Sequence, residues 1–286
     1  MFVIIGIAVV LLGVLGGFVF NGGPLLVLIQ PGEFMIIGAA CVGSLLVGTP
    51  LAVLKRLIGS IGTILKGDPY GKEQYISLLK TMYELFNVAK RDGLISIEAH
   101  ITDPSKSAIF KKNEFLLKNH HALDFLCDTM KLILGGCVPA FDLEALLEAD
   151  IDTHHDEEAA VPTLIQSLGD ALPGLGIVAA VLGIVITMQA IDGPPAEVGE
   201  KVAAALVGTF LGILMSYGFI QPLAANLGLL NQRSSRYYEC MKAGIVAYAK
   251  GNAPVVVVEF ARRVIFAAVR PSFDEVEKAV KTVKAG

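Results

Sequence analysis

The sequence predicts an all-α integral membrane protein with four transmembrane helices, a large helical cytoplasmic loop and a helical cytoplasmic tail. The first observation is composition: 54% of the 286 residues are hydrophobic, which is too apolar for an ordinary soluble domain of this length. The second is that a membrane helix needs roughly 20 apolar residues to cross a core about 30 Å thick. Four stretches without a charge meet that requirement, at 2–20, 34–54, 171–191 and 202–220.

The third observation is the distribution of basic residues. Residues 21–33 contain no Lys or Arg and residues 192–201 contain only Lys201, whereas 55–170 contains twelve and 221–286 contains ten. Because cytoplasmic segments carry the excess of Lys and Arg, both large segments and both termini are expected in the cytoplasm. The predicted organisation is a first transmembrane hairpin (1–54), a cytoplasmic helical domain (55–170), a second hairpin (171–220) and a cytoplasmic tail (221–286).

A secretory signal peptide is the alternative interpretation of residues 2–20. The stretch lacks a basic n-region, its apolar run is long, and FVFNGG at 18–23 is a poor small-residue cleavage site. We therefore expect a membrane span.

The cytoplasmic segments are predicted to be helical. A first helix has Asp68 as its N-cap and Gly93 as its stop, and a second has Asp103 capping before Pro104. Apolar spacing predicts further helices over 121–136, from about 141, over 257–268 and after Pro271. Residues 142–158 hold eight carboxylates and no Lys or Arg, which favours a solvated helix face over an acidic docking strip.

No set of residues indicates enzyme chemistry. The His pairs 120/121 and 154/155 are adjacent in sequence, so within each pair the rings point about 100° apart on a helix and cannot chelate together. There is no phosphate-binding loop, nucleophile elbow or HExxH motif. Four scattered cysteines, at 41, 127, 137 and 240, are expected to be reduced and structural. We expect no enzyme activity, no metal and no cofactor.

Small residues recur at every fourth position in the apolar stretches. Such stripes let helix backbones approach closely, and several together indicate a tightly packed multi-helix assembly. They comprise Ala204, Gly208, Gly212 and Ser216 in the fourth stretch, Ala40, Ser44 and Gly48 in the second, and Gly13 and Gly17 in the first.

Ion transport normally requires an ionisable residue inside the bilayer. Glu33 and Asp170 stand at the ends of apolar stretches, where we expect both to be wet. Either the protein moves no ions, or the titrating carboxylate belongs to a partner. The polar Thr209 is expected to bond the carbonyl of Ala205 or, alternatively, to line a pore.

Pro173 lies one turn into the third stretch and Pro222 at the end of the fourth. Each removes an i to i−4 hydrogen bond and tends to bend a helix. Hinges and simple helix ends are both consistent with the sequence.

Four segments together resemble the family that includes MotA, TolQ and ExbB, and particularly its MotA branch, the larger subunit of the bacterial flagellar stator. They are GDALPGLGIVAAVLG (169–183), VGTFLGILMSYGFIQPLA (207–224), VEFARR (258–263) and RPSF (270–273). The resemblance implies that five such chains surround a dimer of MotB, whose single membrane helix bears the proton-accepting Asp. It also implies that Pro173 and Pro222 couple protonation there to a shape change in the cytoplasmic loop.

The resemblance further implies contact with the rotor protein FliG through an Arg and a Glu. Glu98 matches the Glu, whereas the basic position falls on Lys90 or Arg91. Sodium-driven relatives carry a Thr where this chain has Ala180, and only Thr209 of a second Thr pair remains. Protons are therefore the expected coupling ion, and sodium is less expected. The resemblance also implies that the protein lies in a bacterial inner membrane. The alternatives are a TolQ or ExbB-type energiser of outer-membrane processes, and a scaffold that conducts nothing.

Overall fold

The computed structural model describes residues 2–136, 138–189 and 191–284. These residues form helices and turns and include no strand, so the all-α prediction is confirmed. The chain divides into two compact units: unit 1 comprises Met1–Gly67 and Glu157–Leu230, and unit 2 comprises Asp68–Asp156 and Asn231–Gly286. Unit 2 combines most of the predicted loop (55–170) with most of the predicted tail (221–286). Cys137 lies outside the described residues.

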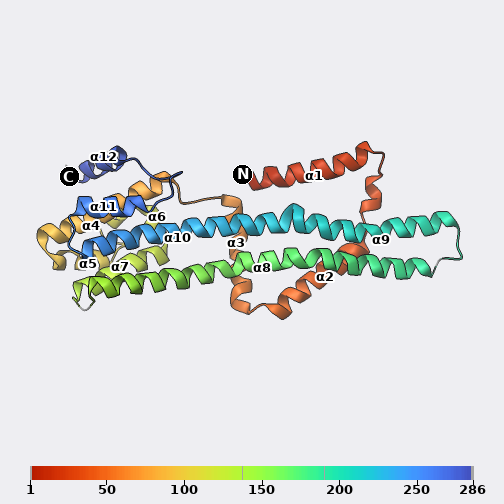
Figure 1. Cartoon of the computed structure of the whole chain (residues 1–286), viewed down its shortest axis with the longest axis horizontal. Coiled ribbons are helices and arrows are strands. Elements are labelled where there is room, and N and C mark those ends of the chain that lie inside the picture. Colours follow the sequence, from red (N-terminus) through yellow and green to blue (C-terminus); the bar gives the residue numbers. More distant parts are fainter. Residues whose placement is uncertain (1, 137, 190, 285–286) are drawn as a thin grey trace. The chain divides into compact units, whose positions relative to one another are not determined.

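Unit 1 contains the membrane-spanning helices, which are labelled in Figure 1. Among the described residues, four helices are long and apolar enough to cross a membrane, as predicted. The elements are α1 (Phe2–Phe20), η1 (Leu25–Leu28), α2 (Pro31–Gly48), α3 (Leu51–Lys66), the second part of α8 (Ala140–Met188), α9 (Pro195–Met215), a π-helix η4 (Ser216–Ile220) and the start of α10 (Gln221–Ala249).

The second predicted span is displaced in the structure. The helix begins at Pro31 and ends at Gly48, whereas the apolar stretch runs to residue 54. The residue before Pro50 is restricted to extended conformations, and Thr49 has φ −129° and ψ 128°. Proline therefore ends α2, and the remaining apolar residues begin the separate helix α3.

Helices α8 and α9 run side by side in Figure 1, and they contact each other through glycines. A Cβ on Gly176 would lie 2.8 Å from the carbonyl oxygen of Gly208 and 3.1 Å from the Cα of Gly212. A Cβ on Gly212 would lie 2.6 Å from the carbonyl oxygen of Leu172. Because these neighbours are backbone atoms, the two helices approach this closely only with glycine at the contacts.

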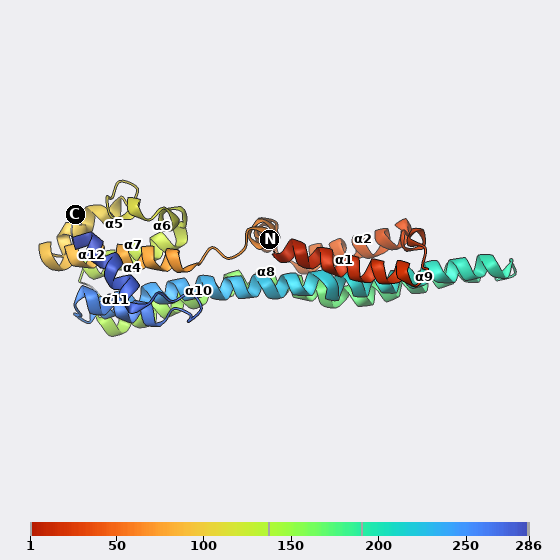
Figure 2. The same cartoon turned by 90° about the horizontal axis from the view of Figure 1, so that it is seen from above.

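The small residues of the first two spans behave differently. A Cβ on Gly13, Gly17 or Gly48 would meet nothing within 4 Å. Figure 2 shows α1 and α2 on the same side of the α8–α9 pair, and α1 has no buried residue. These stripes therefore lie uncovered in the single chain.

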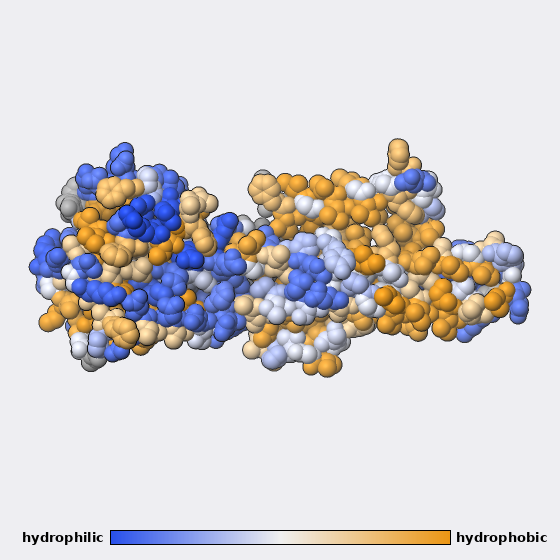
Figure 3. Space-filling model, viewed as in Figure 1, coloured by the Kyte–Doolittle hydropathy of each residue, from blue (hydrophilic) through white to orange (hydrophobic). Residues whose placement is uncertain are grey.

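Unit 2 is a helical domain with its own core. Its elements are α4 (Lys72–Asp92), η2 (Leu94–Ile97), α5 (Glu98–Thr102), η3 (Phe110–Lys112), α6 (Glu114–Lys118), α7 (His120–Leu134), the first part of α8, the second part of α10, α11 (Pro254–Arg263) and α12 (Phe273–Lys284). The core joins Leu78 and Phe86 to Leu126, Tyr237 and Ile245, all fully buried. On the face drawn in Figure 3, hydrophilic residues are more frequent over unit 2 and hydrophobic residues over unit 1.

The helix boundaries in unit 2 correct two expectations. Asp68 does not cap α4; its Oδ1 accepts a hydrogen bond from the backbone N–H of Tyr70, and α4 begins at Lys72. No helix starts at Pro104, because residues 104–109 form turns. Gly93 does end α4, with φ 87°, a conformation that favours glycine.

The VEFARR segment forms the end of α11, where Glu259 accepts hydrogen bonds from Arg262 at 2.7 and 2.8 Å and from Arg263 at 2.7 Å. These guanidinium groups lower the pKa of Glu259 to about 2.

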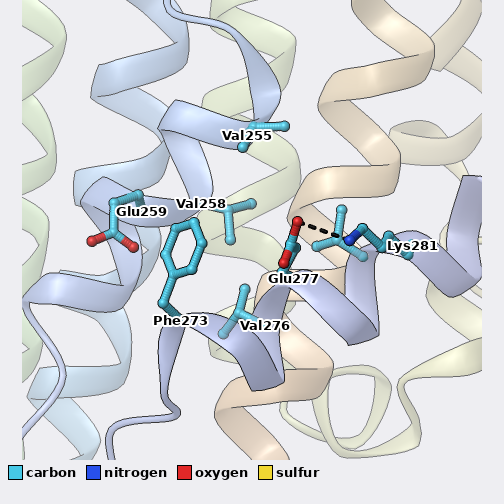
Figure 4. A pocket seen from close by; sticks show the side chains of 8 residues that line it. Val255, Val258, Glu259, Phe273, Val276, Glu277 and Lys281 are labelled. Carbon is cyan, nitrogen blue, oxygen red and sulfur yellow. Dashed lines mark ion pairs between the residues drawn. The ribbon is translucent and has the colours of Figure 1, made fainter.

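Helices α11 and α12 border a pocket of about 110 Å³ (Figure 4). It is lined by Val255, Val258, Phe273 and Val276, and Glu277 and Lys281 form an ion pair there at 2.9 Å. Each of these ion pairs lies within a single helix, so the side chains that α11 and α12 share in the pocket are mainly apolar.

The glycine contact predicts a large difference between two neighbouring positions of α8. Gly176→Ala must push α9 away, and overpacking of this kind costs about 1–3 kcal/mol. Gly174→Ala is the matched control, because a Cβ there meets nothing within 4 Å. Thermal unfolding of the detergent-solubilised chain should show a lower midpoint for Gly176→Ala only. Equal midpoints would contradict the close approach of the two backbones.

Candidate functional site: the proline-bearing helices

Both prolines singled out in the sequence lie inside continuous helical segments. Helix α8 continues from Ala140 to Met188 through Pro162 and Pro173. Helical conformation likewise runs from Pro195 to Ala249, past Pro222. The helix-end interpretation is therefore wrong for both prolines, and sequence reasoning passed over Pro162.

Pro173 removes the N–H that would bond the carbonyl of Gly169. Ser216, on the facing segment, replaces it: its Oγ donates to the Gly169 oxygen at 2.6 Å. Ser216 is fully buried, so this carbonyl has its donor without water. The two helices are thus joined at the point where one of them has lost an internal bond.

Gln221 extends this connection toward solvent. Its Nε2 donates to Ser216 Oγ at 3.2 Å and to Asp170 Oδ1 at 3.0 Å. Asp170 also accepts from Gln166 at 3.0 Å and is exposed, as expected. We call Gly169, Asp170, Ser216 and Gln221 the proline network.

The segment before Pro222 is a π-helix, Ser216–Ile220. The Gln221 N–H bonds the carbonyl of Ser216, five residues earlier, which is the wide-turn pattern. Pro222 then leaves the carbonyl of Gly218 without its i+4 donor. Single π turns occur frequently at functional sites. Neither the hydropathy nor the spacing of small residues in this segment predicts the π turn.

Ala180 and Thr209, the predicted ion-path residues, lie along the same helix contact. A Cβ on Gly208 would lie 3.2 Å from the Ala180 nitrogen, and one on Gly176 would lie 3.3 Å from the Cα of Thr209. The expected bond from Thr209 to the Ala205 carbonyl does not occur among the described residues. Its partly exposed hydroxyl remains available to another group.

Glu33 is not in a wet position, contrary to expectation. It lies in the first turn of α2, but its residue exposure is 9%. Its carboxylate contacts Gly208 of α9 and lies near Gly183 of α8. Distance from a helix end did not predict this burial, because a neighbouring helix covers the side chain.

The predicted rotor-contact residues occupy the turn between α4 and α5. Lys90 and Arg91 end α4 and Glu98 begins α5, and all three are exposed. Arg91 donates to both oxygens of Asp92, at 2.9 and 2.8 Å. No ion pair of Lys90 or Glu98 occurs among the described residues.

One histidine of each pair contacts a histidine of the other pair within unit 2, and sequence spacing did not predict this contact. The ring centres of His121 and His154 lie 5.1 Å apart, edge to face, and His154 also contacts Tyr238. His155 bonds Ser235 at 3.0 Å. These contacts join α7, α8 and α10.

Comparison with known proteins identifies this arrangement. The profile "Motility protein A N-terminal" matches residues 4–93, and the profile "MotA/TolQ/ExbB proton channel family" matches residues 120–240. The motility protein A of Salmonella typhimurium is 38% identical over 99% of this chain and 96% of its own length, as is that of Escherichia coli. The chain belongs to the MotA/TolQ/ExbB proton channel family.

The fold agrees with this assignment. A solved structure described as C. jejuni MotAB superposes with a TM-score of 0.77, covering 94% of this chain and 98% of that chain at 18% identity. The MotA-like arrangement of helices is therefore retained although most residues differ.

The Ser216 bond predicts a specific loss of stability. Ser216→Ala leaves a buried carbonyl without a donor, which costs about 1–3 kcal/mol. Ser44→Ala is the control, because the exposed Ser44 hydroxyl bonds only the Cys41 carbonyl in its own helix, at 2.9 Å. Denaturation of the solubilised protein should distinguish the two variants. An unaffected Ser216→Ala protein would show that water supplies the missing donor.

Proposed function

We propose that this chain assembles with MotB into a complex that converts proton flow across the inner membrane into torque on the rotor protein FliG. The observation that carries the proposal is the proline network: a proline within one long helix is compensated by a hydroxyl from the facing helix. Release of this bond would give the contact a second state, and a mechanical element requires two states.

The partner supplies the essential acid in this proposal. The MotB helix bears an Asp that accepts the proton, and this chain surrounds it with helices of low polarity. Several copies of the chain surround the partner, five on the family pattern. The uncovered small residues of α1 and α2 support close packing against further helices.

Protons are the proposed coupling ion. Ala180 offers no side-chain oxygen to a sodium ion that must lose its water, and sodium prefers oxygen ligands. A proton needs only an acceptor. The basic residues of 55–170 and 221–286 support a cytoplasmic position for unit 2 and for both termini.

One experiment distinguishes the MotA-type function from the TolQ or ExbB-type function. Deletion of the gene should leave full-length but paralysed flagella. Normal swimming with a leaky envelope or failed nutrient uptake would favour the TolQ or ExbB-type function, provided that no second stator set substitutes. No catalytic chemistry is proposed for the chain.

Substitution of the proline should separate assembly from rotation. Pro173→Ala restores an N–H that can bond the Gly169 carbonyl, so the Ser216 bond becomes redundant and α8 stiffens. We expect normal copurification with MotB and no rotation of tethered cells. Pro162→Ala, in the same helix, is the control and should retain rotation. Normal swimming with Pro173→Ala would count against a hinge at this site.

Charge reversal identifies the basic rotor contact. Lys90→Glu and Glu98→Lys should each reduce torque strongly, while Arg91→Glu should have a smaller effect because Arg91 already pairs with Asp92 at 2.8 Å. Lys278→Glu, on the exposed face of α12, is the control. Torque measured on beads decides the matter: paralysis by Arg91→Glu with normal rotation of Lys90→Glu would assign the contact to Arg91.

A further inference from the structure

Glu33 is the one acidic side chain that the described residues bury in the membrane-spanning part of unit 1. Its Oε2 has no hydrogen-bond partner among those residues. A charge at such a position costs several kcal/mol, and buried acids in membrane spans commonly mark ion pathways. The side chain therefore requires a role beyond filling space.

The carboxylate lies at the level of the predicted ion-path residues. A Cβ on Gly208 would collide with Oε2 and would lie 3.1 Å from the Cβ of Ala179 and 3.2 Å from the nitrogen of Ala180. A Cβ on Gly183 would lie 3.3 Å from Oε1. Gly183 is five residues before the end of α8 at Met188, so the carboxylate lies roughly 8 Å inside that end.

No basic side chain among the described residues neutralises this carboxylate. Residues 171–188 of α8 carry no charge, and on α2 the other titratable group is Cys41, two turns away. On α9 the charged groups are Glu197, Glu200 and Lys201. Lys201 forms an ion pair with Glu197 at 3.0 Å. It lies one helical turn before Ala205, the residue of α9 that faces Gly183 of α8.

We propose that Glu33 is a proton-binding site on the path to the partner's carboxylate. A hydronium ion from the side of the membrane where α2 begins gives its proton to a Glu33 oxygen, leaving water. The carboxylic acid then gives that proton to the next acceptor, a water or the partner's Asp, and the carboxylate is restored. Gly183 and Gly208 provide the space. This inference rests on the proposed proton-driven function.

Proton uptake by cells co-expressing the chain and MotB tests the proposal. Glu33→Gln has nearly the same shape and stays uncharged, as the protonated acid is, but it cannot take up or release a proton. It should lower uptake at least tenfold with normal copurification. Glu200→Gln, an exposed carboxylate on α9, should match wild type. Uptake by Glu33→Gln equal to wild type overturns the inference. No uptake by the wild-type complex overturns the proposed function instead.

A second comparison applies if Glu33→Gln does not assemble. Glu33→Asp keeps a titratable group, whereas Glu33→Ala does not. Proton uptake that is retained in the Glu33→Asp complex and lost in the Glu33→Ala complex supports proton binding by Glu33. Equal uptake by the two assembled variants overturns it. Infrared absorption of a protonated carboxyl group, present in a complex with the partner's Asp changed to Asn and absent after Glu33→Gln, gives a readout independent of transport.

Discussion

The close approach of α8 and α9 is the constraint on which unit 1 depends. Lipid offers little hydrophobic driving force for association of helices, so packing must supply it. Backbone-to-backbone contact at Gly176, Gly208 and Gly212 supplies that packing. It also fixes the register that brings Ser216 opposite Gly169 and places Glu33 beside Gly208. The same glycines therefore set the helix distance, the hydrogen bond at Pro173 and the burial of the carboxylate.

Prolines in a membrane helix usually leave backbone carbonyls that something else must satisfy. Here a serine from another helix satisfies the carbonyl at Gly169. An intrahelical bond has thereby become an interhelical one, which forms only when the two segments are in register. Bending of α8 and sliding of α9 are linked by that bond, and the π-helix beside it already has a widened turn.

Sequence reasoning predicted the elements better than their contacts. Hydropathy located the four spans, and Gly93 located the end of α4, because each is a local property. The end of α2 was misplaced because apolar residues continue past Pro50 into α3. The joining of loop and tail into one unit, the Ser216 bond and the burial of Glu33 each depend on which residue faces which across long sequence separations. Spacing along one helix carries no such information. The burial of Glu33 depends on the register of α8 against α9, so its position at a helix end led to the prediction of a wet side chain.

Helix α1 has nineteen residues and none of them is buried by the rest of the chain. Its contacts are peripheral, such as the approach of Val10 to Gly218. The free energy that orients α1 is therefore set mainly by whatever surrounds the subunit, whether acyl chains or adjacent copies. Bilayer thickness and lipid type then become determinants of its tilt, as much as the sequence of the helix itself.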